Sequence, residues 1–104
     1  MTLAELKDLL SATGLPVTYR LWPVDNAPAL PFVCYRVLES RNFAADGVVY
    51  QPADLVSVEL YTAQKDLASE AKVEAALHDD FAWEKEETYS DDEKCYIVYY
   101  EIEV

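Results

Sequence analysis

The amino-acid sequence predicts a single α+β domain, in which two helices pack on one face of a mainly antiparallel sheet of about five strands. Three observations support this fold class. Two segments have apolar residues at helical spacing, and several others alternate apolar with polar residues. The length of 104 residues suits one domain, residues 1–104. The predicted order of elements is α-β-β-β-α-β-β.

The first helix is predicted over residues 2–13. Thr2 and Glu5 have the spacing of a capping box, which satisfies free N–H groups in the first turn. Leucines follow at positions that share one side of a helix. Gly14 is placed to end the helix in the left-handed conformation.

The second helix is predicted over residues 66–80, with Asp66 as its cap. Three apolar residues fall on one side of it, namely Leu67, Val73 and Leu77. Glu70 and Glu74 interrupt this apolar side. They are like charges at positions i and i+4, an arrangement that destabilises an isolated helix.

Five segments have the pattern of strands. They are residues 17–22, 32–41, 53–62, 82–90 and 93–104. The second and third are expected to pair antiparallel, and the last two are expected to form a hairpin that turns at Ser90-Asp91-Asp92. Prolines in residues 23–31 indicate a rigid connection instead of a strand.

The segment between the second and third strands, Asn42 to Pro52, is unusually apolar for a connection. The pair Asp46-Gly47 predicts a tight turn, and short β pieces can flank it. The apolar residues of the segment are Phe43, Val48, Val49 and Tyr50. They either fold back on their own core or enter a neighbouring chain, and we favour the neighbour.

Charge is unevenly distributed along the chain. The formal net charge is −12: residues 1–52 hold five acids and four bases, a net of −1, and residues 53–104 hold fifteen acids and four bases, a net of −11. Such a balance argues against nucleic-acid and anionic-membrane binding, because phosphates need a basic surface. The acidity either keeps the protein soluble or lets copies meet head to tail.

A contact between copies would explain the two interrupting glutamates. Arg36 or Arg41 of one copy is expected to meet Glu70 or Glu74 of the next. The alternative is that both glutamates lie at the solvent boundary of the helix. The predicted interface residues are therefore Arg36, Arg41, Phe43, Asp46, Gly47, Val48, Val49, Tyr50, Glu70 and Glu74.

The sequence contains no recognisable catalytic, cofactor or metal site, so we expect no enzyme and no cofactor. The single histidine, His78, lies near the end of the second helix, and Cys34 and Cys95 are too far apart for a zinc motif. Both cysteines are expected to be buried thiols in a cytosolic protein. The chain has neither a signal-peptide pattern nor an apolar stretch of membrane-spanning length.

Several segments together resemble a known family. They are Leu-Pro-Val-Thr-Tyr-Arg (15–20), Leu-Pro-Phe-Val-Cys-Tyr (30–35), Asn-Phe-Ala-Ala-Asp-Gly-Val-Val-Tyr (42–50), Val-Glu-Leu-Tyr-Thr-Ala-Gln-Lys-Asp (58–66), Glu-Ala-Lys-Val-Glu-Ala-Ala-Leu (70–77) and Tyr-Ile-Val-Tyr-Tyr-Glu-Ile-Glu-Val (96–104). The family consists of small proteins from the tail modules of long-tailed phages and prophages of Gram-positive bacteria. They are described as minor tail, tail-completion or tail-terminator proteins.

The resemblance implies a structural function in virion assembly. Tail terminators form a ring, commonly of six copies, which caps the tail tube and joins the tail to the head. The implied partners are further copies, the tail-tube protein and a head-completion protein, first in the host cytoplasm and then at the head–tail junction of the virion. An alternative from the acidic half is a protein-binding module, such as an inhibitor or a DNA-mimicking adaptor.

Overall fold

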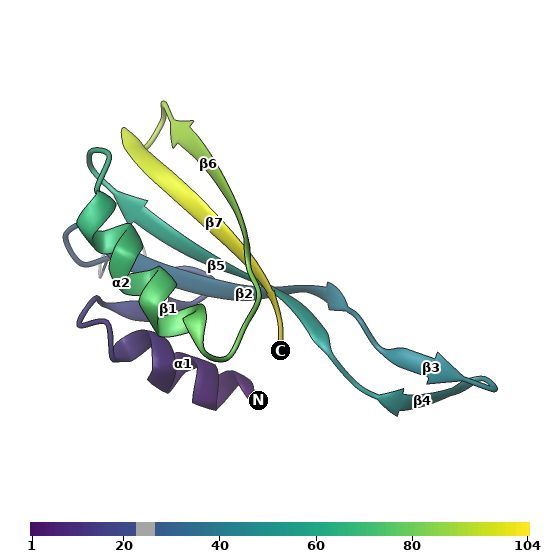
Figure 1. The fold of residues 1–104 in the computed structure, drawn as a ribbon. Coiled ribbons are helices and arrows are strands. Elements are labelled where there is room, and N and C mark those ends of the chain that lie inside the picture. Colours follow the sequence, from purple (N-terminus) through teal and green to yellow (C-terminus); the bar gives the residue numbers. More distant parts are fainter. Residues whose placement is uncertain (23–26) are drawn as a thin grey trace.

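The structure is a computed structural model that describes residues 1–22 and 27–104. Its elements are α1 (Leu3–Ser11), β1 (Val17–Tyr19), β2 (Phe32–Ser40), β3 (Phe43–Ala45), β4 (Val48–Gln51), β5 (Asp54–Thr62), α2 (Leu67–His78), β6 (Glu84–Ser90) and β7 (Cys95–Glu103). The predicted α+β class is confirmed, with both helices on one side of the sheet (Figure 1). Part of the connection that was predicted from its prolines, residues 23–26, lies outside the described residues.

The main sheet has five strands in the order β1-β2-β5-β7-β6. β2 pairs with β5, β5 with β7, and β6 with β7, all antiparallel. β1 is the exception, because it runs parallel to β2. This strand is shorter than predicted. It ends at Tyr19 because Arg20 takes a φ of 68°, a left-handed conformation that interrupts an extended chain.

α1 begins with the predicted capping box. The Thr2 hydroxyl accepts a hydrogen bond from the Glu5 backbone N–H at 3.1 Å, and the Glu5 carboxylate accepts one from the Thr2 N–H at 3.3 Å. Leu6 and Leu10 are fully buried against the sheet. Gly14 follows the helix with a φ of 84°, a conformation that favours glycine.

α2 begins at its predicted cap, where the Asp66 carboxylate accepts a hydrogen bond from the Ser69 N–H at 3.0 Å. Val73 and Leu77 are fully buried, as predicted. The prediction that Leu67 shares their side is wrong. It stands in the first turn, where 70% of its surface is exposed.

The core lies between the helices and one face of the sheet. It joins leucines of both helices to alternate residues of β2, β5 and β7. Its fully or almost fully buried members are Leu6, Leu10, Val33, Tyr35, Val56, Val58, Leu60, Val73, Leu77, Val98, Tyr100 and Ile102. The core therefore includes every element of the body except β1 and β6, and partly buried residues such as Val17 border it.

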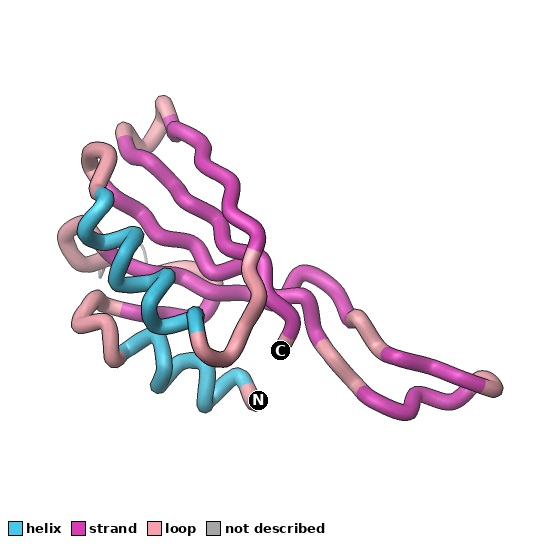
Figure 2. Tube along the Cα trace, viewed as in Figure 1, coloured by secondary structure: helices cyan, strands magenta, loops and turns pink. Residues whose placement is uncertain are grey.

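β3 and β4 form a separate two-stranded antiparallel ribbon. Asp46 and Gly47 make its turn with φ values of 54° and 75°, as the sequence predicts. The ribbon continues from β2 and β5 and projects away from the body (Figures 1 and 2). It makes the molecule elongated, with dimensions of 48 × 27 × 22 Å. Neither helix in the described part of the chain is long and apolar enough to cross a membrane.

The central position of β5 gives a test of the core. Replacing Leu60, which is fully buried, by alanine leaves a cavity and should lower the free energy of unfolding by about 2–5 kcal/mol. Urea denaturation measures this loss. Leu67→Ala on the exposed first turn of α2 is the control and should cost less than about 0.5 kcal/mol. Equal losses in the two variants would contradict the described core.

Candidate functional site

The projecting ribbon of β3 and β4 is the candidate interface. Its two valines, Val48 and Val49, are 59% and 49% exposed. The main contacts of each ribbon strand are with the other ribbon strand. Val48 and Val49 therefore do not fold back on the core, and for these two residues that alternative is wrong. They offer apolar surface at a distance from the body.

Phe43 and Tyr50 were predicted to contribute to the same surface. Their backbones lie in β3 and β4. Their side chains lie outside the described residues. The large apolar side chains that the structure describes on the ribbon are therefore those of Val48 and Val49, which lie beside the turn at Asp46 and Gly47.

The two arginines of the predicted interface have acidic partners in their own chain. The Arg41 guanidinium donates to the Glu39 carboxylate at 3.1 Å, close to the base of the ribbon. The Arg36 Nε donates to Glu59 at 3.0 Å. Both arginine side chains remain about half exposed, at 43% for Arg36 and 50% for Arg41. Their outer atoms stay accessible to a partner.

Glu59 is a buried charged residue that the sequence analysis did not single out. It lies in the middle of β5 on the face of the sheet opposite the helices, and only 4% of it is exposed. Its carboxylate also accepts hydrogen bonds from the Ser57 hydroxyl at 3.3 Å and the Tyr61 hydroxyl at 3.0 Å. Burial and the neighbouring Glu59 charge raise the pKa of the Tyr61 hydroxyl. In the sequence, this cluster is visible as three polar residues, Ser57, Glu59 and Tyr61, which alternate with apolar residues along the strand.

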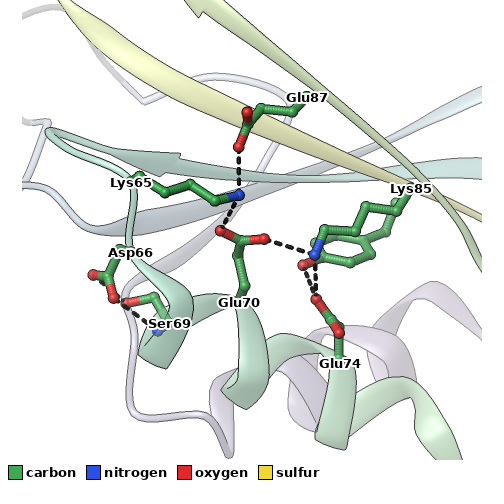
Figure 3. A network of polar contacts seen from close by, with 8 residues as sticks. Lys65, Asp66, Ser69, Glu70, Glu74, Lys85 and Glu87 are labelled. Atoms are coloured by element: carbon green, nitrogen blue, oxygen red, sulfur yellow. Dashed lines mark hydrogen bonds and ion pairs between the residues drawn. The ribbon is translucent and has the colours of Figure 1, made fainter.

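Glu70 and Glu74 belong to a charged network between α2 and the sheet (Figure 3). Glu70 is 2% exposed, and its two oxygens meet the ammonium groups of Lys65 at 2.7 Å and Lys85 at 2.6 Å. Lys85 also meets Glu74 at 2.8 Å. The expectation that a neighbouring copy supplies the cation is therefore wrong. Lysines of the same chain supply it, which also explains why two like charges tolerate each other on one helix.

The network has two further members that fasten α2 to the sheet. The Tyr100 hydroxyl donates to the Glu74 carboxylate at 2.7 Å, and Lys65 also binds Glu87 of β6 at 2.6 Å. Burial acts to raise the pKa of the Glu70 carboxyl, but the hydrogen bonds from Lys65 and Lys85 outweigh it, so the pKa is lowered. The network therefore joins α2 to the sheet within a single chain.

The histidine and the two cysteines lie on three different elements, α2, β2 and β7. His78 is exposed in the last turn of α2. The prediction that both cysteines are buried thiols is confirmed, since Cys34 and Cys95 are each 2% exposed and form no disulfide. Burial, with a smaller effect of nearby carboxylates, raises the pKa of Cys34 to about 11. Among residues 1–22 and 27–104, no group of three or more His, Cys, Asp or Glu side chains is arranged to hold a metal ion.

Replacing Glu70 by glutamine tests the charged network. The variant should be less stable than the parent by about 3 kcal/mol at neutral pH, because it removes the charge that both lysines share. The folded-state pKa of Glu70 is lowered, so its stabilisation is present above the unfolded pKa and is lost as pH falls through the folded pKa. The difference in stability should therefore shrink below about pH 4.

The control for this substitution is Glu87→Gln. The Glu87 side chain is 39% exposed, so losing its contact with Lys65 should cost less than about 1 kcal/mol. Thermal or urea unfolding of both variants across the pH range makes the measurement. A Glu70→Gln chain as stable as its parent at neutral pH would show that the network contributes little.

Comparison of the sequence with protein-family models and with curated proteins gives no match for this chain.

Proposed function

We propose that this chain is a structural assembly protein of a long-tailed phage or prophage. In this proposal it is a tail terminator or tail-completion factor, which caps the tail tube as a ring of copies and joins the tail to the head. The segments that resemble such proteins support the phage assignment. The observation that carries an assembly function is the projecting ribbon with its exposed valines.

The physical argument concerns the stability of the ribbon. A two-stranded hairpin alone in water is marginally stable at best, because it has no third strand and no apolar layer to cover it. Here β3 and β4 contact chiefly each other. Val48 and Val49 stay in water in the single chain. A partner that covers these side chains would stabilise the ribbon, so the ribbon is suited to assembly.

Charge also suits contact between copies. The segment from Asn42 to Pro52 carries one charged residue, Asp46, in a chain with a net charge of −12. An almost neutral arm can approach an acidic copy of the same chain with little repulsion. A ring requires two different surfaces on each copy, one that reaches out and one that receives. The ribbon supplies the first of them.

The second candidate function is an acidic module that binds a basic or nucleic-acid-binding protein. Its support is a group of carboxylates on the face of the sheet opposite the helices. Glu84 of β6 stands directly across from Glu101 of β7, and Glu86 and Glu103 lie on the same face. Like charges directly opposite destabilise a sheet. This candidate explains the acidic edge but leaves the ribbon without a role, so we favour assembly.

A double substitution on the ribbon tests the assembly function. Val48→Asp with Val49→Asp should leave the unfolding transition of the body unchanged, because both side chains are exposed and distant from the core. In a phage or prophage that lacks its own copy of the gene, the variant should fail to complete tails. Electron microscopy should then show overlong tails or tails without heads, and the titre of infectious particles should fall.

Leu67→Asp is the matched control, because Leu67 is also an exposed apolar residue but lies on α2, away from the ribbon. It should support normal tails. Normal tails with the double variant would refute a role for the ribbon in assembly. Unchanged tails together with binding of the wild-type chain to a nucleic-acid enzyme would favour the acidic-module function instead.

A further inference from the structure

The two edges of the five-stranded sheet differ in how they are protected. The β6 edge carries charges along its length, with Glu84, Lys85, Glu86 and Glu87 in succession, all exposed. Charged edge strands resist pairing with another chain. A strand from a partner is therefore disfavoured at β6.

The opposite edge is only partly covered. β1 pairs with β2 over three positions, from Val17↔Val33 to Tyr19↔Tyr35. Beyond Tyr35, no described strand pairs with the outer side of β2, and the Val37 N–H donates to the Tyr19 hydroxyl at 3.3 Å. A bulge between Val37 and Glu39 adds Leu38, which is 39% exposed. This outer edge, residues 37–40, has no strand partner among the described residues and carries one exposed apolar side chain.

The arginines of the chain gather around the outer edge of β2. All three arginines of the chain are close to it in sequence: Arg20 follows β1, Arg36 lies in β2, and Arg41 follows β2. Arg20 and Arg36 line a hollow of about 250 Å³ on the face of the sheet opposite the helices. The one charge of the ribbon is Asp46 at its tip. Arg36 and Arg41 pair with Glu59 and Glu39 of their own chain but stay about half exposed. The carboxylate at the ribbon tip therefore meets more positive charge here than at the acidic β6 edge.

We propose that the ribbon of one copy adds as extra strands to the outer edge of β2, residues 37–40, in a second copy. This inference rests on the proposed assembly function and names the receiving surface. β4 has four residues, Val48–Gln51, which matches the four residues of that edge. Backbone hydrogen bonds give such a contact its strength. The side chains of Val48 and Val49 point to opposite faces of the strand, so one of them packs beside Leu38.

The ribbon cannot reach the same edge in its own chain. It leaves β2 at Ser40 and runs outward to its turn at Asp46, about 20 Å away at about 3.3 Å per residue. Folding back would break the pairing of β3 with β4. The donor and acceptor surfaces are different, so each copy can give to one neighbour and receive from another. Such a heterologous contact generates a ring when its rotation closes.

Cross-linking between two kinds of chain tests the inference. One chain carries Val48→Cys and the other, with a different affinity tag, carries Leu38→Cys. The native thiols of Cys34 and Cys95 are buried, so a short bismaleimide selects the introduced ones. Mixed at high protein concentration, the two chains should give a cross-linked heterodimer as the main product. Adding Val49→Asp to the donor chain should abolish it.

Tyr89→Cys is the matched control for the acceptor. Tyr89 is 44% exposed, close to the exposure of Leu38, but it lies on the charged β6 edge, so its chain should cross-link to Val48→Cys only in traces. Three results would each overturn the inference. They are equal yields of cross-linked product with both acceptors, cross-linking only between two Val48→Cys chains, and no cross-linked product between copies. A failure of this kind is distinct from a failure of the assembly function, which the tail-completion assay measures separately.

Discussion

β5 is buried on both of its faces, and the positions of the other elements follow from that burial. Val56, Val58 and Leu60 require an apolar layer on one face, and both helices provide it. Glu59 points to the opposite face, where Arg36 and its hydroxyl neighbours satisfy its charge. β2 and β7 must then flank β5 to satisfy its backbone hydrogen bonds. Where β2 and β5 run past this body, neither helix covers them, and they continue as the ribbon.

Much of this fold could be predicted from the sequence because its signals are local. The capping box of Thr2 and Glu5, the alternation along β5 and β7 and the turn at Asp46-Gly47 depend on residues close together in the chain. The apolar character of Val48 and Val49 likewise marked the ribbon as the candidate interface, and the structure places both valines on its exposed surface.

The remaining features depend on contacts between distant parts of the chain. The parallel pairing of β1 with β2 has no local pattern, and three residues are too few to show one. The network around Glu70 brings together Lys65 and Lys85, which stand on either side of α2 in the sequence, so its carboxylates suggested a partner chain instead. Glu59 was missed because a charged residue that alternates with apolar ones indicates a solvent-facing side, whereas Arg36 from another strand satisfies it in place of water.

In the proposed assembly the body folds by itself, whereas the ribbon is stabilised by another chain. Backbone amide hydrogen exchange measures both parts at once. In dilute protein the amides of residues 43–51 should exchange rapidly, while those of β5 and β7 stay protected. On concentrated protein, or on chains bound to tail tubes, the ribbon and the outer edge of β2 should become protected together. Strong protection of the ribbon in dilute monomer, or no gain on assembly, would contradict the claim.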